Sequence, residues 1–371
     1  MSNVYVKTRI YSGDKSIKYL EEIKNQVILI VCDKFLVESK AVSYLTNILE
    51  SNNEIHIYDG VVPDPSTEVV VEGIKHICKE KPSILIGFGG GSAIDTAKAI
   101  LYFTKLENLT SQPLFIAVPT TSGTGTEVTS LTVITDKESN VKKIIESEDI
   151  LPDVALLDPA LTLTVPKAIT ANTGMDVLTH ALEAYVSKNN NAFSDALSEK
   201  SIELLIKSLV KCYEEGNNLD SRKMMQEAST LAGMSFNIAG LGLNHSIAHQ
   251  LGATFHIPHG LANAMLLNSV IDYNCKDELI LKKYAKLSYK LQFVNIDENP
   301  KIAVEILKRI IKTMMISMNM PLRIRDMNIS QADYQNSINI MVENTLKDRC
   351  LPTTPKDISS DDIKEILLQI Y

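Results

Sequence analysis

The sequence predicts a doubly wound α/β domain with a mostly parallel sheet, followed by a domain built of helices. Three features support this prediction: short apolar runs near the start, helical spacing between those runs, and a different pattern beyond about residue 150. Continuous apolar runs are typical of strands that are covered on both faces, as in parallel sheets. With 371 residues, of which 45% are hydrophobic, the chain is long enough for roughly two domains.

The apolar runs are the expected strands, and they lie at residues 27–32, 55–58, 83–87 and 114–118. Between them, stretches such as ESKAVSYLTNILES and STEVVVEGIKHICKE repeat apolar residues every three or four positions. That spacing predicts amphipathic helices. Strands and helices that alternate in this way form βαβ units and hence a doubly wound sheet.

Prolines mark the expected boundary between the two domains. Pro152, Pro159 and Pro166 interrupt regular structure after the last apolar run. We therefore expect an α/β domain over residues 1–163 and a helical domain over residues 164–371. Helical spacing continues in the second domain, for example in VLTHALEAYVS and FSDALSEKSIELLIKSLVKCYEE.

Charge and cysteine content narrow the class of protein. Lysine and arginine total 37 against 45 aspartates and glutamates, a net charge of −8 without a basic stripe, so nucleic acid is not an expected partner. The five cysteines are widely spaced without a CxxC pair, which indicates reduced thiols in a cytoplasmic protein. The sequence has no run of ~18 apolar residues and no signal-type start, so we expect no membrane association or export.

A cluster of glycines follows the strand expected at residues 83–87, in the stretch ILIGFGGGSAIDTAK. Gly90 and Gly91 allow the backbone to approach a ligand closely, and Ser92 and Asp95 open the next helix, whose N–H groups and dipole suit a phosphate. The stretch departs from the dinucleotide fingerprint because a serine replaces the third glycine, and no Walker lysine follows. Taken alone, it fits a phosphate site and a plain strand-to-helix turn equally well.

A second loop and an aspartate favour a dinucleotide site. The loop VPTTSGTGTEVT offers hydroxyl groups for a pyrophosphate and ribose, although such loops are also ordinary turns. Its candidate residues are Thr120, Thr121, Thr124 and Thr129. Asp33 ends the first apolar run, where a carboxylate can bind a ribose diol and repel a 2′-phosphate, or can simply cap a helix. All three features lie at the carboxyl ends of expected parallel strands, where open α/β sheets bind ligands.

Histidines and an aspartate form a further group of candidates. Asp176 and His180 lie four apart in a helical pattern, so they share a face and could bind a divalent metal or hydrogen-bond to each other. The apolar stretch GLNHSIAHQLGATFHIPHG concentrates more histidines than packing alone would explain, although a surface position is the alternative. They are His245, His249, His256 and His259.

Four motifs resemble the iron-dependent (group III) alcohol dehydrogenase family: GGGSAID, PTTSGTGTEVT, TANTGMDVLTHALEAYVS and HSIAHQLGATFHIPHG. The resemblance spans nearly the whole chain. It implies the dehydroquinate synthase-like fold of that family, with a dinucleotide-binding α/β domain and an all-α metal-binding domain. The segments TRIYSG and ASTLAGMSF look most like the branch of the family that acts on 1-propanol in propanediol-utilisation microcompartments.

The resemblance implies a role for each candidate residue. One divalent metal, normally Fe²⁺ with Zn²⁺ as the alternative, is implied on Asp176, His180, His245 and His259. His249, which is not a ligand in the family, is implied as the catalytic neighbour of substrate and nicotinamide, and His256 is treated as structural. Asp33 falls at the acidic position of NAD-preferring members. The rest of the implied NAD(H) site consists of Gly90, Gly91, Ser92, Asp95, Thr120, Thr121, Thr124, Thr129 and Lys142.

The implied function is an NAD(H)-dependent alcohol dehydrogenase for short-chain primary alcohols. It would reduce propanal or acetaldehyde to 1-propanol or ethanol, as a homodimer or higher oligomer in the cytoplasm, with microcompartment enzymes or shell as further partners. Two alternatives stay open: a zinc-dependent polyol dehydrogenase of the glycerol type or a synthase-like relative, and a microcompartment assembly component with secondary catalysis.

Overall fold

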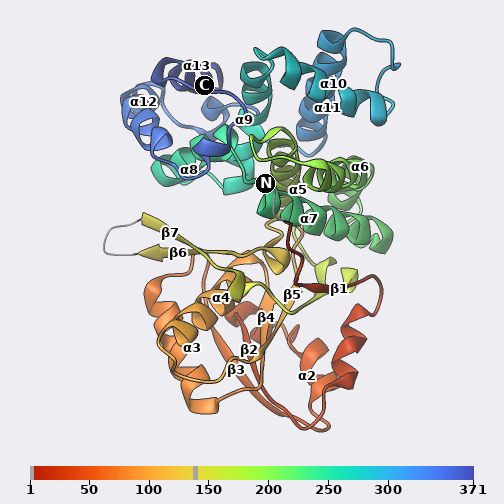
Figure 1. Ribbon diagram of the computed structural model, residues 1–371, viewed down its shortest axis with the longest axis vertical. Coiled ribbons are helices and arrows are strands. Elements are labelled where there is room, and N and C mark those ends of the chain that lie inside the picture. Colours follow the sequence, from red (N-terminus) through yellow and green to blue (C-terminus); the bar gives the residue numbers. More distant parts are fainter. Residues whose placement is uncertain (1–3, 137–140) are drawn as a thin grey trace. The chain divides into compact units, whose positions relative to one another are not determined.

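The computed structural model describes residues 4–136 and 141–371, and the chain divides into two compact units. The α/β unit consists of Tyr5–Val165 with Asn217–Gly233, and the helical unit consists mainly of Pro166–Gly216 and Met234–Tyr371 (Figure 1). The predicted fold class, a parallel α/β part followed by helices, is confirmed. The boundary at residue 163 stays a prediction, because it concerns which parts fold independently.

A six-stranded parallel sheet forms the centre of the α/β unit, with the strand order β1-β8-β5-β4-β2-β3. The order reverses between β2 and β4, and such a switch point opens a crevice at the carboxyl ends of the strands. Asp33 ends β2 there and Gly89 ends β4. The strands are β1 (Arg9–Ser12), β2 (Val27–Asp33), β3 (Glu54–Val61), β4 (Ile84–Gly89), β5 (Leu114–Pro119) and β8 (Val154–Leu157).

Side chains of the central strands alternate between two apolar layers, which explains why their sequences do not alternate in polarity. Ile28 and Ile30 of β2 pack in one layer, whereas Leu29 and Val31 pack in the other. Figure 1 shows α2 and the pair α3 and α4 on opposite faces of the sheet. The first layer is covered by η1 (Ser16–Glu22), α1 (Lys34–Glu38) and α2 (Ser43–Leu49), and the second by α3 (Thr67–Glu80) and α4 (Gly91–Leu106).

An antiparallel hairpin that the sequence did not predict follows the Ser/Thr-rich loop. It pairs β6 (Leu131–Asp136) with β7 (Val141–Glu146). The hydroxyl of Thr132 donates to the carbonyl oxygen of Asp95 at 2.7 Å, so the hairpin is fastened to α4 directly behind the glycine loop. The short turns of this unit are η2 (Thr126–Val128), η3 (Glu148–Ile150) and η4 (Pro159–Thr162).

Helix α5 (Lys167–Val186) forms the centre of the helical unit. Its residues from Gly174 onward are buried, and it packs on α6 and α9. Among the described residues, no helix is both long and apolar enough to cross a bilayer. The other helices of this unit are α6 (Ala192–Glu214), α8 (Leu243–Phe255), α9 (His259–Asn274), α10 (Glu278–Lys290), α11 (Pro300–Ser317), η5 (Ile324–Met327), α12 (Gln331–Leu346), η6 (Leu351–Thr353) and α13 (Ser360–Gln369). Most of α7 (Leu219–Ala239), up to Gly233, belongs to the α/β unit.

Candidate active site

Helix α5 presents two of the predicted metal ligands on one face. Asp176 and His180 are one turn apart and buried, and 3.8 Å separates Asp176 Oδ2 from His180 Nε2. Gly260 in the first turn of α9 lets that helix pack closely on α5, because a Cβ there would lie 2.0 Å from the carbonyl oxygen of Asn172. The helical spacing and this glycine together place the α9 side chains next to Asp176.

Helices α8 and α9 supply the other two predicted ligands. His245 Nε2 lies 3.7 Å and His259 Nε2 lies 3.6 Å from Asp176 Oδ1. His245 is buried, whereas 43% of the His259 side chain is exposed. One donor atom from each of the four residues lies within 4.8 Å of all the others. The structure thus brings Asp176, His180, His245 and His259 into one cluster, with its open side at His259.

The donor set of this cluster suits a divalent transition metal. Donors held at about 2.0–2.2 Å around a tetrahedral ion stand roughly 3.3–3.6 Å apart. The carboxylate of Asp176 lies 3.6–3.8 Å from the three imidazole nitrogens, which is close to that spacing. Burial raises the pKa of Asp176, but the three histidines lower it far more, so the carboxylate is ionised and able to bind a cation. One oxygen and three imidazoles fit both Fe²⁺ and Zn²⁺.

Glu183 holds His245 from behind. Its Oε2 accepts a hydrogen bond from His245 Nδ1 at 2.5 Å, and its Oε1 accepts one from the backbone N–H of Asn244 at 2.6 Å. Nε2 of His245 therefore points into the cluster. Burial lowers the pKa of His245, but the hydrogen bonds to Asp176 and Glu183 outweigh it and raise that pKa to about 9.

Asn263 of α9 joins the ligands to one another. Its Nδ2 donates to Asp176 Oδ1 at 2.7 Å and lies 3.2 Å from Nε2 of both His245 and His259. Asn244 donates from Nδ2 to Asn263 Oδ1 at 2.9 Å, which fixes the orientation of the Asn263 amide. The cluster is therefore held by a hydrogen-bonded frame of buried side chains.

His249 lies beside the cluster and belongs to a different group of side chains. Its ring stacks on that of His259, with centroids 5.5 Å apart and planes 16° from parallel. Its Nδ1 lies 2.8 Å from Asp348 Oδ2, in the connection between α12 and α13. The exposed His256 ends α8 in the left-handed conformation, with φ 53°, and is not one of the four clustered residues.

Three polar residues at this centre are absent from the sequence prediction. Glu183 lies seven residues after Asp176, and Asn263 lies four residues after His259, so helical spacing offered a signal for both. Asp348 lies 99 residues from His249, and no local pattern marks it.

At the switch point of the sheet, the two carboxylate oxygens of Asp33 face different parts of the chain. Its Oδ1 accepts a hydrogen bond from the backbone N–H of Leu36 at 3.0 Å and so caps α1. Its Oδ2 faces the glycine loop, because a Cβ added to Gly89 would lie 3.7 Å from it. The helix-cap interpretation is therefore confirmed, and a contact between the second oxygen and a ribose diol stays a prediction.

The glycine loop packs directly on the threonine loop. A Cβ on Gly91 would lie 2.7 Å from Thr124 Cγ2, and one on Gly90 would lie 3.3 Å from Thr121 Oγ1. Thr120 continues the contact through its backbone N–H, which donates to the carbonyl oxygen of Gly89 at 2.9 Å. Helix α4 begins here without a side-chain cap, which leaves its first N–H groups available for a phosphate.

Asp95 and Thr129 lie in a network around the buried Lys98. The Nζ of Lys98 donates to the hydroxyl and carbonyl oxygens of Thr129 at 3.0 and 2.6 Å and to Thr126 Oγ1 at 2.9 Å. The hydroxyl of Thr126 in turn donates to Asp95 Oδ1 at 2.6 Å. Burial lowers the pKa of Lys98 to about 8, although Asp95 and Glu127 act in the opposite direction. These contacts brace the threonine loop, and direct cofactor contacts of Asp95 and Thr129 stay predictions.

Ser92 and Lys142 are the two remaining residues of the predicted cofactor site. Ser92 is partly exposed in the first turn of α4, next to the uncapped N–H groups. The backbone of Lys142 lies in β7 opposite Thr135, whereas its side chain lies outside the described part of the chain.

The glycine and threonine loops lie at the switch point of the sheet, and the same chain contains a cluster of one aspartate and three histidines. This combination is typical of a metal-dependent dehydrogenase. A family model for iron-containing alcohol dehydrogenase matches residues 7–159, and the model for the C-terminal part of the Fe-containing alcohol dehydrogenase family matches residues 170–371. The chain belongs to the iron-containing alcohol dehydrogenase family, and it is an oxidoreductase that acts on CH–OH groups. The resemblance seen in the motifs is thereby confirmed.

Full-length relatives carry more specific names. The chain is 42% identical to the 1-propanol dehydrogenase PduQ of Salmonella typhimurium, over 100% of both chains. It is 35% identical to an NADPH-dependent butanol dehydrogenase of Clostridium saccharobutylicum, over 98% of this chain and 96% of that protein. It also resembles the solved structure of a 1,3-propanediol oxidoreductase, with a TM-score of 0.91, 35% identity and 100% coverage of both chains.

Proposed function

We propose that this enzyme interconverts short-chain primary alcohols and aldehydes with NAD(H), and that it reduces propanal or acetaldehyde with NADH. The observation that carries the proposal is the cluster of one carboxylate and three imidazoles, held within 4.8 Å by buried helices. The names of the relatives favour three- and four-carbon alcohols. The carboxylate of Asp33 supports NAD(H) over NADP(H) because its charge would repel a 2′-phosphate.

The residues of this chain divide the work of the reaction. A divalent ion bound to the cluster would polarise the substrate oxygen, and the nicotinamide would carry the hydride. Reduction of an aldehyde also consumes one proton, which the alcohol oxygen takes up. His249 is a titratable side chain beside the ligands, and because its Nδ1 is engaged by Asp348, Nε2 is the atom left to hold or release that proton.

The experiment that tests this proposal compares substrates and cofactors. Anaerobic enzyme loaded with Fe²⁺ is mixed with propanal, acetaldehyde, butanal or dihydroxyacetone, each with NADH and with NADPH. We expect the highest kcat/KM for propanal or acetaldehyde with NADH. Because one methylene is worth about 1–3 kcal/mol, the aldehydes should differ by roughly 10- to 200-fold. Preference for dihydroxyacetone would replace the proposal by the polyol dehydrogenase alternative.

Zinc remains the alternative metal, because the donor set fits both ions. We propose Fe²⁺ as the working ion on the strength of the family. Loading the metal-free protein with each ion separately and measuring turnover per bound ion tests this choice. Higher turnover with Zn²⁺ would contradict it.

Assembly and location are proposals as well. We propose that the protein is a homodimer or larger homo-oligomer in the cytoplasm and that it is enclosed in a microcompartment. The motifs are most similar to the branch of the family that acts on 1-propanol in such compartments. Sedimentation analysis of the purified protein tests the oligomer, and co-purification with microcompartment shells tests encapsulation. A monomer at micromolar concentration would contradict the proposed oligomer. Absence of the protein from purified shells would contradict encapsulation.

A further inference from the structure

We infer that Asp348 is the positioning residue for His249, and that it fixes the orientation and the tautomer of that ring. The inference rests on the proposed function, in which His249 exchanges a proton with the substrate oxygen. It assigns a part in the reaction to the connection between α12 and α13, which supplies none of the four proposed metal ligands.

The contact between the two side chains is short and sheltered. His249 Nδ1 lies 2.8 Å from Asp348 Oδ2, and only 12% of the Asp348 side chain is exposed against 28% of His249. Burial raises the pKa of Asp348, but the hydrogen bonds that its carboxylate accepts, above all the one from His249, lower it to below its usual range. An ionised carboxylate can only accept hydrogen bonds, so Nδ1 of His249 must carry a hydrogen. Nε2 then holds the lone pair of the neutral ring.

The other oxygen of Asp348 is already occupied. Its Oδ1 accepts the backbone N–H of Cys350 at 2.9 Å and the hydroxyl of Ser246 at 3.2 Å. Ser246 lies on α8, one turn before the position of His249 on the same helix. The carboxylate is therefore held between its own chain segment and α8, with Oδ2 left for the imidazole.

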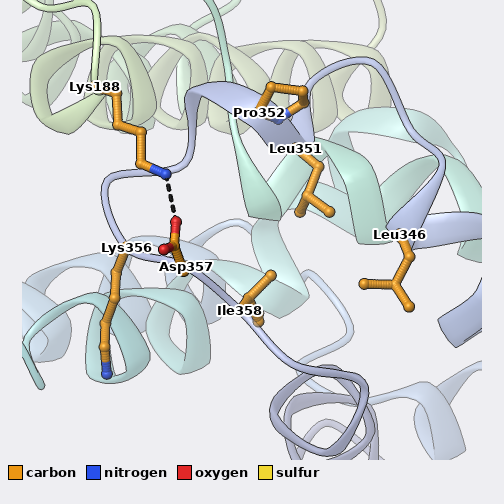
Figure 2. A pocket seen from close by; sticks show the side chains of 7 residues that line it. All are labelled: Lys188, Leu346, Leu351, Pro352, Lys356, Asp357 and Ile358. Carbon is orange, nitrogen blue, oxygen red and sulfur yellow. Dashed lines mark hydrogen bonds and ion pairs between the residues drawn. The ribbon is translucent and has the colours of Figure 1, made fainter.

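The segment that carries Asp348 is fastened on its outer side. The hydroxyl of Thr353 donates to the carbonyl oxygen of Leu241, and the carbonyl oxygen of Thr353 accepts a hydrogen bond from the backbone N–H of Lys188 at 2.9 Å. Figure 2 shows the ion pair between Lys188 Nζ and Asp357 Oδ1, at 2.7 Å, on the rim of a pocket that Leu346, Leu351 and Ile358 line. The hydrogen bonds of Thr353 thus anchor the connection from which Asp348 projects, which suits the placement of a single ring. The ion pair of the fully exposed Asp357 adds little to this anchoring.

Asp348→Asn tests the inference through the tautomer. Because Cys350 N–H and the Ser246 hydroxyl still need an acceptor, the asparagine oxygen stays with them and its NH₂ group faces His249. Nδ1 must then accept, and Nε2 gains the hydrogen. We expect kcat for propanal reduction to fall about 10- to 100-fold, with KM and bound metal nearly unchanged, since general acid–base transfer contributes 10²–10⁴-fold.

The matched control is Asp357→Asn, the same substitution at an exposed position of the same segment. It removes the ion pair with Lys188 without touching His249, so kcat should stay within about twofold. In a His249→Gln background, Asp348→Asn should have little further effect, because both changes remove one function. An equal loss from Asp357→Asn, or additive losses in the double variant, would overturn the inference.

A second readout does not depend on turnover. In Zn²⁺-loaded protein labelled with ¹⁵N-histidine, long-range ¹H–¹⁵N spectra report which ring nitrogen of His249 carries the hydrogen. We expect Nδ1–H in the unsubstituted protein and Nε2–H in Asp348→Asn. The same tautomer in both would overturn the inference, even if the enzyme proved inactive on aldehydes and the proposed function failed.

Discussion

Each imidazole of the metal cluster presents one nitrogen toward Asp176, and the partner of its other nitrogen decides how firmly the ring is placed. Glu183 takes that part for His245. His249 is outside the ligand set, and its Nδ1 contacts Asp348 as Nδ1 of His245 contacts Glu183. At the scale of single residues, carboxylates therefore have two proposed roles: Asp176 is the proposed oxygen ligand of the ion, whereas Glu183 and Asp348 each orient an imidazole.

Replacing one ligand should remove metal and activity together. In His180→Ala one of four donors is lost, and metal affinity should fall by more than about 100-fold, beyond the usual effect of an outer-shell change. Metal counted after dialysis against a weak chelator, together with turnover of propanal, checks this. His256→Asn is the control, since His256 is exposed at the end of α8 and should leave both quantities intact. An active His180→Ala enzyme with full metal content would contradict the ligand assignment.

Asp33 should set the choice between NADH and NADPH. Asp33→Asn removes the negative charge but keeps a side-chain oxygen that can cap α1, so stability should change little. We expect the ratio of kcat/KM for NADPH to that for NADH to rise about tenfold, which corresponds to ~1.4 kcal/mol of relieved repulsion. Initial rates at low cofactor concentration give this ratio. No change in the ratio would assign Asp33 to the helix cap alone.

At the scale of elements, α5 gathers three functional groups on one buried face. Asp176, His180 and Glu183 follow one another at intervals of four and three residues. The sequence predicts two metal ligands on this helix, Asp176 and His180. The third group on its face is the outer support for a ligand that comes from α8.

Glu183→Gln should weaken metal binding without unfolding α5. The amide has nearly the same size but lacks the charge that draws a hydrogen from His245, and loss of such a partner typically costs 10- to 100-fold in metal affinity. Competition with a chelator of known affinity measures the change. Glu203→Gln on the surface of α6, which loses only exposed ion pairs, should bind metal normally. Equal affinities in the two variants would rule out this role of Glu183.

Helix α4 supports the threonine loop through Lys98. Lys98→Met would leave the carbonyl oxygens of Thr129 and Leu131 and the buried carboxylates without their cation, so the free energy of unfolding should fall by about 3–5 kcal/mol. Urea unfolding measures this loss, and the NADH dissociation constant should rise in parallel. Lys105 lies on the same helix as Lys98 and forms an exposed ion pair with Asp149 of η3, so Lys105→Met should cost less than about 1 kcal/mol. Similar costs for both would contradict the bracing role.

The elements differ in how far the sequence could predict them. The runs in β2 and β4 were recognisable because both faces of each strand are buried, which leaves a continuous apolar signature. The hairpin of β6 and β7 was not predicted, because its strands follow a Ser/Thr-rich loop without a clear break and their pairing depends on the partner strand.

The same contrast holds in the candidate site. Asp176 and His180 were predictable because one helical turn separates them, and the dense histidines of α8 and α9 pointed to one cluster. Asp348 could not be predicted, because only tertiary packing brings it next to His249. Lys98 belongs to the helix that the glycine loop opens, but its acceptors come from the loop and hairpin beyond β5.

At the scale of the whole molecule, the two compact units carry different parts of the chemistry. The α/β unit holds Asp33 and the glycine and threonine loops, whereas the helical unit holds the four proposed metal ligands with Glu183, Asn263, His249 and Asp348. Cofactor affinity and metal affinity should therefore respond to separate sets of substitutions. A loss of metal from Asp33→Asn, or a loss of NADH binding from Glu183→Gln, would contradict this division.

The most direct test of the account counts metal and turnover in the same sample. Protein stripped of metal is reloaded anaerobically with Fe²⁺, bound iron is counted, and NADH oxidation by propanal is followed. We expect activity to rise in proportion to bound iron and to saturate at one ion per chain, with no recovery in His259→Ala. Full activity without metal, or saturation of the cluster by Fe²⁺ without any turnover of an alcohol or aldehyde, would contradict it.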